Sequence, residues 1–159
     1  CAASGALGPK RKQGDGQVPE GFYAVDKLNP TSTFHLSLHV DYPNAADRKR
    51  GKRDHVGDLG GDIMVHGNCV TVGCIPIEDD PIELLYLVVN DTMSSTHAAS
   101  VPITIFPARD IAALIASTND DELRAFWKPL DEANRSFNKS HTMPLVRVQP
   151  DGTYAVNPF

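Results

Sequence analysis

The alternation of apolar and polar residues from Phe34 to Val40 most constrains what this chain can fold into. Apolar side chains occupy every second position, and polar side chains, including His35 and His39, lie between them. A period of two places the apolar residues on one face of a half-buried β-strand. His35 and His39 then share the other face, where we interpret them as surface or satisfied polar positions rather than ligands.

Further short segments predict strands that are separated by turns. Ile63-Met64-Val65 is typical of a short buried strand. The other predicted strands are 22–25, 101–106 and a closing hairpin of 145–148 and 153–156 around the turn 149–152. The segments 5–21 and 41–61 are interpreted as loops.

Helix signals are clearest after Asp80. Asp80 suits an N-cap, and Glu83 three residues later completes an arrangement like a capping box. Residues 110–116 predict a short helix, and 121–137 a longer one that Pro129 breaks or kinks. Short strands with two or three helices indicate a mostly β, α+β fold. After Asp80, the apolar residues on one helical face are Ile82, Leu85, Tyr86 and Val89.

The bulk composition limits the class of protein. A length of 159 residues fits one domain, residues 1–159, and 41% hydrophobic residues indicate a globular chain. The net charge of −5 argues against nucleic acid as the main partner, and the basic run 48–53 is interpreted as a solvated loop. No apolar stretch approaches the roughly 18 residues of a membrane-spanning helix. Because the chain begins with Cys1 rather than Met, we expect a fragment or a processed form.

The segment 65–75 contains the residues with the clearest chemistry. His66-Gly67 is followed, eight residues after the histidine, by Cys74, which Gly73 precedes. A thiol becomes a strong nucleophile when a nearby imidazole takes its proton. A glycine before the nucleophile lets backbone N–H groups approach the oxygen of a reacting carbonyl. The segment therefore predicts a base, a nucleophile and an oxyanion hole.

Three cysteines leave other interpretations open. Cys69 is as near to His66 as Cys74 is, but it lacks the preceding glycine, so we predict a structural or disulfide-bonded role. We predict that Cys74 is the free thiol and that Cys1 and Cys69 form the pair, which three free thiols in the unfolded, unreduced protein would contradict. A zinc site from His66, Cys69 and Cys74 lacks a convincing fourth ligand, so no metal or cofactor is predicted.

The order of these motifs resembles the YkuD-type L,D-transpeptidase catalytic domain, in particular its YafK-like branch, which includes the murein lipoprotein amidase. The resemblance covers essentially the whole chain. It implies a YkuD-like fold with a sandwich-like or barrel-like sheet core, whose first one or two strands would precede Cys1. It rests on 18–23 (Val-Pro-Glu-Gly-Phe-Tyr), 29–30 (Asn-Pro) through 42–44 (Tyr-Pro-Asn), His66-Gly67, Gly73-Cys74, 126–127 (Phe-Trp) and the closing hairpin.

The resemblance also implies roles for individual residues. Cys74 would be the nucleophile and His66 the base, oriented by the carbonyl of Gly67. The oxyanion donors would be the N–H groups of Val72, Gly73 and Cys74. Residues expected to contact the substrate are Thr71, at the family's Ser/Thr position, and Tyr23, Tyr42 and Asn44.

Three departures from the common family signature bear on the reaction. Val72 replaces a histidine, Pro76 replaces an arginine, and the segment between His66 and Cys74 is shorter. These changes remove polar contacts from the acyl-acceptor side and agree with the YafK-like branch.

The resemblance then implies cleavage of the amide that links murein to a lipoprotein. The alternatives are stem cross-linking, lipoprotein attachment, or a cell-wall-binding module without catalysis. The expected partners are peptidoglycan stems and a murein-bound lipoprotein, in the periplasm or envelope of a Gram-negative bacterium.

Overall fold

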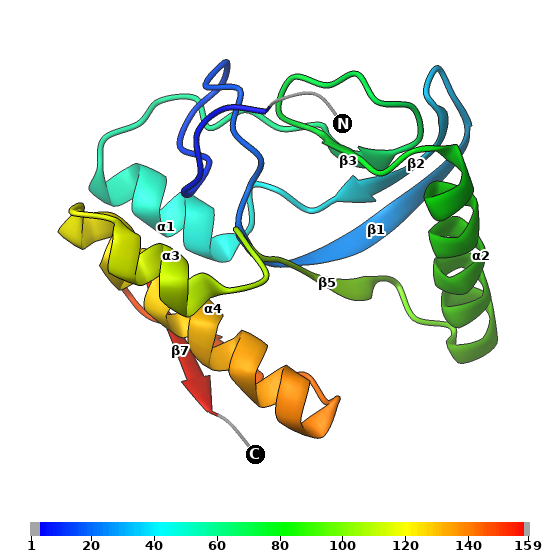
Figure 1. Cartoon of the computed structure of the whole chain (residues 1–159). Helices are drawn as coiled ribbons and strands as arrows, with labels where there is room; N and C mark the ends of the chain where they lie inside the picture. The colour runs from blue at the N-terminus through cyan, green and yellow to red at the C-terminus, as the bar shows by residue number, and fades with distance from the viewer. Residues whose placement is uncertain (1–3, 158–159) are drawn as a thin grey trace.

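The computed structural model describes residues 4–157, which form four helices and seven strands (Figure 1). A five-stranded sheet has the order β4-β3-β2-β1-β5, and β6 and β7 form a separate hairpin. The α+β class and the closing hairpin are confirmed. The bounds are β1 (Gly21–Ser32), β2 (His35–Val40), α1 (Ala45–Arg53), β3 (Ile63–His66), β4 (Ile75–Pro76), α2 (Asp79–Thr96), β5 (Val101–Ile105), α3 (Ile111–Ser117), α4 (Asp121–Ser140), β6 (Leu145–Val148) and β7 (Tyr154–Asn157).

One face of the sheet packs against α2. Leu38 and Val40, from the period-two pattern, are fully buried on this face. They join Val65 of β3 and two residues of α2, Ile82 and Val89, in the larger core. Burial of this apolar stripe stabilises α2 on the sheet.

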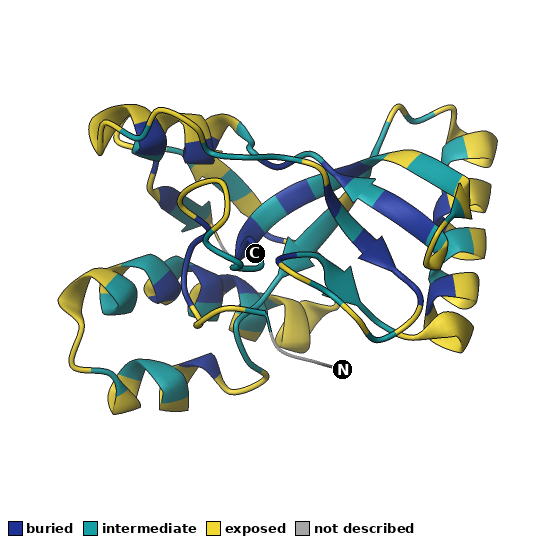
Figure 2. Cartoon of the chain, turned by 90° about the horizontal axis from the view of Figure 1, so that it is seen from above, coloured by how far each residue is buried: buried dark blue, intermediate teal, exposed yellow. Residues whose placement is uncertain are grey.

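A second core lies at the other end of the molecule, where α1, α3 and α4 gather away from α2 (Figure 1). Trp127 and Leu130 of α4 and Ile111 of α3 are its buried centre, and Phe22 of β1 packs against it. Figure 2 shows buried residues along the strands, while the outer turns of the helices are exposed. The sheet thus joins two cores, and β2, β3 and β4 lie at the end that α3 and α4 do not cover.

The prediction of a loop over 41–61 is wrong in part, because α1 lies within it. The helix has no apolar stripe; its buried residues are Ala46, Asp47 and Gly51. Asn44 caps the helix by accepting from the N–H groups of Ala46 and Asp47, and Asp47 completes a capping box. The basic run is thus helical rather than a loop, and its cations in the last turn interact favourably with the helix dipole.

The capping box predicted at Asp80 is also wrong. The helix begins one residue earlier, at Asp79, and its N-cap residue, Glu78, makes no side-chain capping bond. Pro129 does not break α4, which continues through it. The first strand is longer than predicted, at 12 residues. Among residues 4–157, no helix is both long and apolar enough to cross a bilayer.

Candidate active site

His66 is the last residue of β3 and is almost completely buried, with 2% of its surface exposed. Its Nδ1 lies 2.6 Å from the carbonyl oxygen of Gly67, which orients the ring. The Phe34 ring covers the imidazole at a centroid distance of 4.8 Å. With Nδ1 donating to that carbonyl, Nε2 is the nitrogen that can accept a proton.

A parallel pairing brings Cys74 beside β3. Val65 pairs with Ile75, and His66 pairs with Pro76. Ile75 packs against the larger core, as Val65 does. Because successive strand residues face opposite sides, we assign His66 and Cys74 to the side away from α2. Residues eight apart in the sequence therefore share one face of the sheet.

Cys74 is a free, partly exposed thiol, as predicted. Its Sγ contacts the carbonyl oxygen of Asp62 at 3.7 Å. Gly73 before it has a φ of +88°, a conformation that favours glycine. Catalytic hydrogen bonds often tighten only when substrate binds, so this thiol contact is compatible with proton transfer to His66.

The loop 67–74 is braced at both ends. Gly67 approaches Phe34 so closely that a Cβ there would lie 2.8 Å from the Phe34 carbonyl oxygen. The N–H of Asn68 donates to Asp79 at 2.7 Å. Thr71 Oγ1 donates to the carbonyl of Cys74 at 3.0 Å, and it thus braces the turn at the nucleophile.

The amides next to the thiol are available to a ligand. Within the part of the chain that the structure describes, neither Val72 nor Gly73 donates its backbone N–H to a protein acceptor. The Val72 side chain is 86% exposed. Free N–H groups beside a nucleophile are what an oxyanion hole requires.

Cys69 is disulfide-bonded, in agreement with its predicted structural role. The predicted partner, Cys1, lies outside the described residues, so that pairing stays a prediction. A disulfide sulfur is not a thiolate ligand, and the zinc alternative therefore loses one of its three residues. No cluster of three His, Cys, Asp or Glu residues within 4–157 could hold a metal ion.

The other predicted contact residues have structural partners. Tyr42 is buried and donates its hydroxyl to the Leu59 carbonyl at 2.8 Å. Tyr23 is buried and donates to Asp47. Asn44 caps α1. Their contact with substrate stays a prediction, while the observed contacts explain them as parts of the fold.

Asp47 and Arg50 form a buried pair that sequence reasoning missed. Arg50 donates to Asp47, and its guanidinium lies over the rings of Phe126 and Tyr154, at 5.3 and 5.4 Å. Burial raises the pKa of Asp47 above its ordinary value, although Arg50 opposes this. The one sequence signal for the pair is their spacing of three residues, which suits neighbours on a helix.

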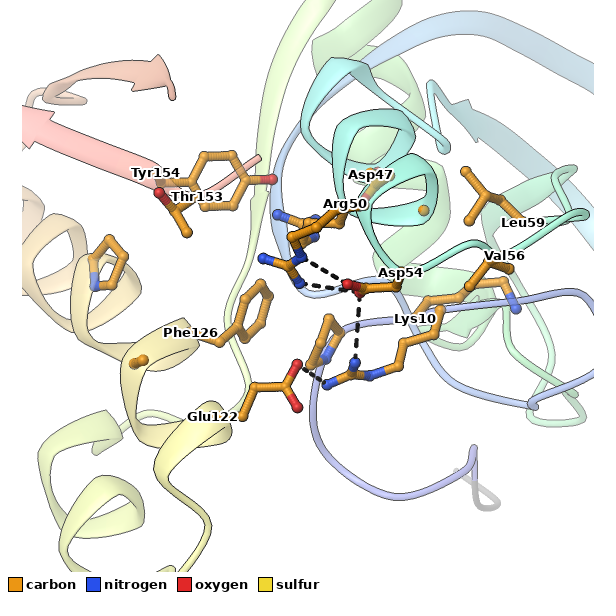
Figure 3. Close-up of a pocket in the computed structure, with 16 residues that line it drawn as sticks. Lys10, Asp47, Arg50, Asp54, Val56, Leu59, Glu122, Phe126, Thr153 and Tyr154 are labelled. Atoms are coloured by element: carbon orange, nitrogen blue, oxygen red, sulfur yellow. Dashed lines mark hydrogen bonds and ion pairs between the residues drawn. The ribbon is translucent and has the colours of Figure 1, made fainter. Parts of the chain in front are cut away.

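A cavity of about 130 Å³ lies beside this pair, between the N-terminal loop, α1, α4 and the closing hairpin (Figure 3). Arg11 bonds Glu122 at 2.8 Å, and Arg53 bonds Asp54 at 2.6 Å. Both arginines line the cavity, and both are thus paired with carboxylates. His66 and Cys74 do not line the cavity, which is separate from the candidate active site.

Fold and site define an α+β protein with a histidine that ends one strand and a free cysteine that directly precedes the parallel strand beside it. No family model matches the chain. The chain is 32% identical, over 99% of its length, to the curated protein "Putative L,D-transpeptidase YafK" of Escherichia coli (strain K12). Its counterpart of the same name in Escherichia coli O157:H7 matches equally. The chain spans 61% of the length of each relative.

A solved structure shares the fold. The helical cell shape determining protein Pgp2 from Campylobacter jejuni has a TM-score of 0.50 over 92% of this chain and 62% of that one, at 17% identity. The fold class expected from the sequence is thereby confirmed.

Proposed function

We propose that this chain is a thiol-dependent acyl-transfer enzyme of the L,D-transpeptidase family that acts on amide bonds of peptidoglycan peptide stems. The observation that carries the proposal is the parallel β3–β4 pairing, which brings the segments of His66 and Cys74 together. Similarity to a relative named as an L,D-transpeptidase, over nearly the whole chain, supports the same reaction class.

The proposed reaction proceeds through a thioester. The thiol of Cys74 gives its proton to His66 Nε2, and Sγ attacks the amide carbon of the stem. The N–H groups of Val72, Gly73 and Cys74 stabilise the oxyanion. The C–N bond breaks, and His66 passes the proton to the leaving amine. An acceptor then attacks the thioester and releases Cys74.

Water is the acceptor that we favour, so that the net reaction is amide cleavage, such as release of a murein-bound lipoprotein. Val72 and Pro76 present no polar side chain where the common family signature has a histidine and an arginine. An amine acceptor would therefore find few partners there. If an amine does replace water, the same thioester yields a stem cross-link or an attached lipoprotein.

We also propose a location in the periplasm or the cell envelope. The disulfide at Cys69 supports export, because disulfides persist in oxidising compartments and are rare in the cytosol.

The direct test uses purified sacculi that carry covalently bound lipoprotein. Wild-type protein and Cys74→Ala are incubated with them, and mass spectrometry reads the muropeptides and the released protein. We expect lipoprotein release by the wild type alone. New stem cross-links without release would make the chain a transpeptidase, and full activity in Cys74→Ala would overturn the thiol mechanism.

Thiol reactivity separates an enzyme from a cell-wall-binding module. We expect iodoacetamide to alkylate Cys74 quickly near neutral pH, and His66→Ala to slow it, because the thiolate is the reactive form. The control is His55→Asn, at an exposed position whose φ of +55° asparagine tolerates. Equally slow labelling in all three proteins would favour the binding module.

A further inference from the structure

A second histidine, paired with a carboxylate, lies on the strand next to that of His66. His39 Nδ1 is 2.5 Å from Asp26 Oδ1. The His39 side chain is 18% exposed and that of Asp26 is 35% exposed. Within residues 4–157, no partner contacts the other ring nitrogen of His39, Nε2. A carboxylate on one nitrogen fixes the tautomer and leaves the other nitrogen free for proton transfer.

The strand register places His39 on the same face as His66. Ser37 of β2 pairs with His66, and His39 pairs with Met64. Side chains two residues apart share a face, so His39 and His66 both project to the side opposite the core.

The same register places His39 level with the nucleophile. Cys74 precedes Ile75, which pairs with Val65, so Cys74 is level with Met64 and hence with His39. Two strand spacings, about 10 Å, therefore separate the His39 and Cys74 backbones, with Met64 of β3 between them. An acyl group on Cys74 would extend into this gap, with one water molecule next to its carbonyl carbon. The His39 ring would contact that water from the opposite side of the gap.

A β-bulge explains how two residues of β1 oppose His39. Val25 pairs with Val40, whereas Lys27 pairs with His39, so that Asp26 is the extra residue. A bulge sets two residues of one strand against one of its partner, and bulges next to active sites commonly redirect a side chain. The Asp26 carboxylate reaches Nδ1 of His39 in this way, while Lys27 is exposed to solvent.

We infer that His39, oriented by Asp26, is a second proton-transfer residue, which activates the acceptor in the deacylation step. This inference rests on the proposed function. His66 is buried under Phe34, whereas the His39 side chain is partly exposed to solvent, from which the acceptor arrives. As water attacks the thioester, His39 Nε2 takes its proton and the C–S bond breaks. The Cys74 thiolate leaves, His39 returns its proton to solvent, and the thiolate regains one.

The test separates the two half-reactions of His39→Gln. A muropeptide substrate is mixed with the enzyme, the reaction is quenched, and intact-mass spectrometry follows the Cys74 adduct. General-base catalysis typically contributes at least about 10²-fold, so we expect deacylation and turnover to fall by about that factor. Acylation and iodoacetamide labelling should stay within about twofold of the wild type. The adduct should therefore accumulate.

His35→Asn is the control, because His35 on the same strand also pairs with a carboxylate, Glu83, at 2.7 Å, and asparagine tolerates its φ of +71°. It should leave both half-reactions unchanged. Asp26→Asn, which removes the charge beside His39, should slow deacylation by a smaller factor. Melting temperatures of all variants check their folding.

Two results would overturn the inference alone: unchanged decay of the adduct in His39→Gln, or an equal loss in both half-reactions, which indicates a structural role. A wild-type enzyme that cleaves substrate without any Cys74 adduct would instead overturn the proposed thioester mechanism, and the inference with it.

Discussion

At the scale of single residues, Gly73 adopts a backbone conformation that favours glycine directly before the nucleophile. Its φ is +88°, and a Cβ there would lie 3.4 Å from the Gln17 carbonyl oxygen. Gly73→Ala should cost about 1–2 kcal/mol of stability from the left-handed backbone alone. It should also lower turnover, because the turn aims the oxyanion amides and the thiol. Denaturant unfolding and the sacculus assay measure the two effects.

Gly14→Ala is the control for Gly73→Ala. Gly14 has a φ of +76°, and no atom lies within 4 Å of the place that a Cβ would take, so the variant carries similar strain away from the reaction. Comparable stability losses, with turnover lost only in Gly73→Ala, are expected. Full turnover in Gly73→Ala would contradict a role for this turn in catalysis.

Local patterns could predict His66 and Cys74 as candidates, because the two residues are eight positions apart and each is next to a glycine. They could not predict the contact between His39 and Asp26. That contact depends on the register between β1 and β2 and on a bulge, neither of which is visible in the residues themselves. The free Cys74 and the bonded Cys69 could be told apart by the glycine that precedes one of them.

At the scale of elements, α1 buries an ion pair and has no apolar stripe. Arg50→Ala would leave Asp47 buried without its cation, and breaking a buried pair typically costs about 3–5 kcal/mol. We expect a loss of this size in urea unfolding. Lys52→Ala, exposed on the same helix, should change stability by less than about 0.5 kcal/mol. Equal effects would show that the pair does not stabilise α1.

The same helix explains a failure of prediction at this scale. A period of 3.6 in apolar residues signals a helix, but α1 buries an alanine, an aspartate and a glycine. By contrast, β2 and the apolar face of α2 follow their periods closely, since they pack against each other in the larger core. A helix that buries an ion pair and small residues gives little periodic signal in its apolar residues.

At the scale of the whole molecule, Glu20 links the N-terminal loop to the second core. Its carboxylate accepts from the N–H of Gly8 and from Trp127 Nε1, both at 2.7 Å. Burial raises the pKa of Glu20 above its ordinary value of 4.5, although these two hydrogen bonds oppose the shift. A raised folded-state pKa contributes stability below the unfolded value, which is lost as pH rises through the folded value.

Glu20→Gln tests this link. The amide has one oxygen for two N–H donors, so the variant should lose about 1–3 kcal/mol. The loss relative to wild type should be larger at about pH 4 than at about pH 7, because the stability that the raised pKa of Glu20 contributes is lost as pH rises through the folded-state value. Urea unfolding at both pH values measures it, with Glu132→Gln, exposed on α4, as the control. A loss that grows with pH would contradict the assignment.

The short connection between β3 and β4 has a consequence for evolution and engineering. Parallel strands usually need a dozen or more connecting residues, whereas residues 67–74 number only eight. The length of this segment determines which residue lies beside His66. Because strand side chains alternate, lengthening it by one residue while the pairing of β4 is kept would turn a different residue toward the histidine. Variation in this segment must therefore conserve its length or rebuild the edge of the sheet.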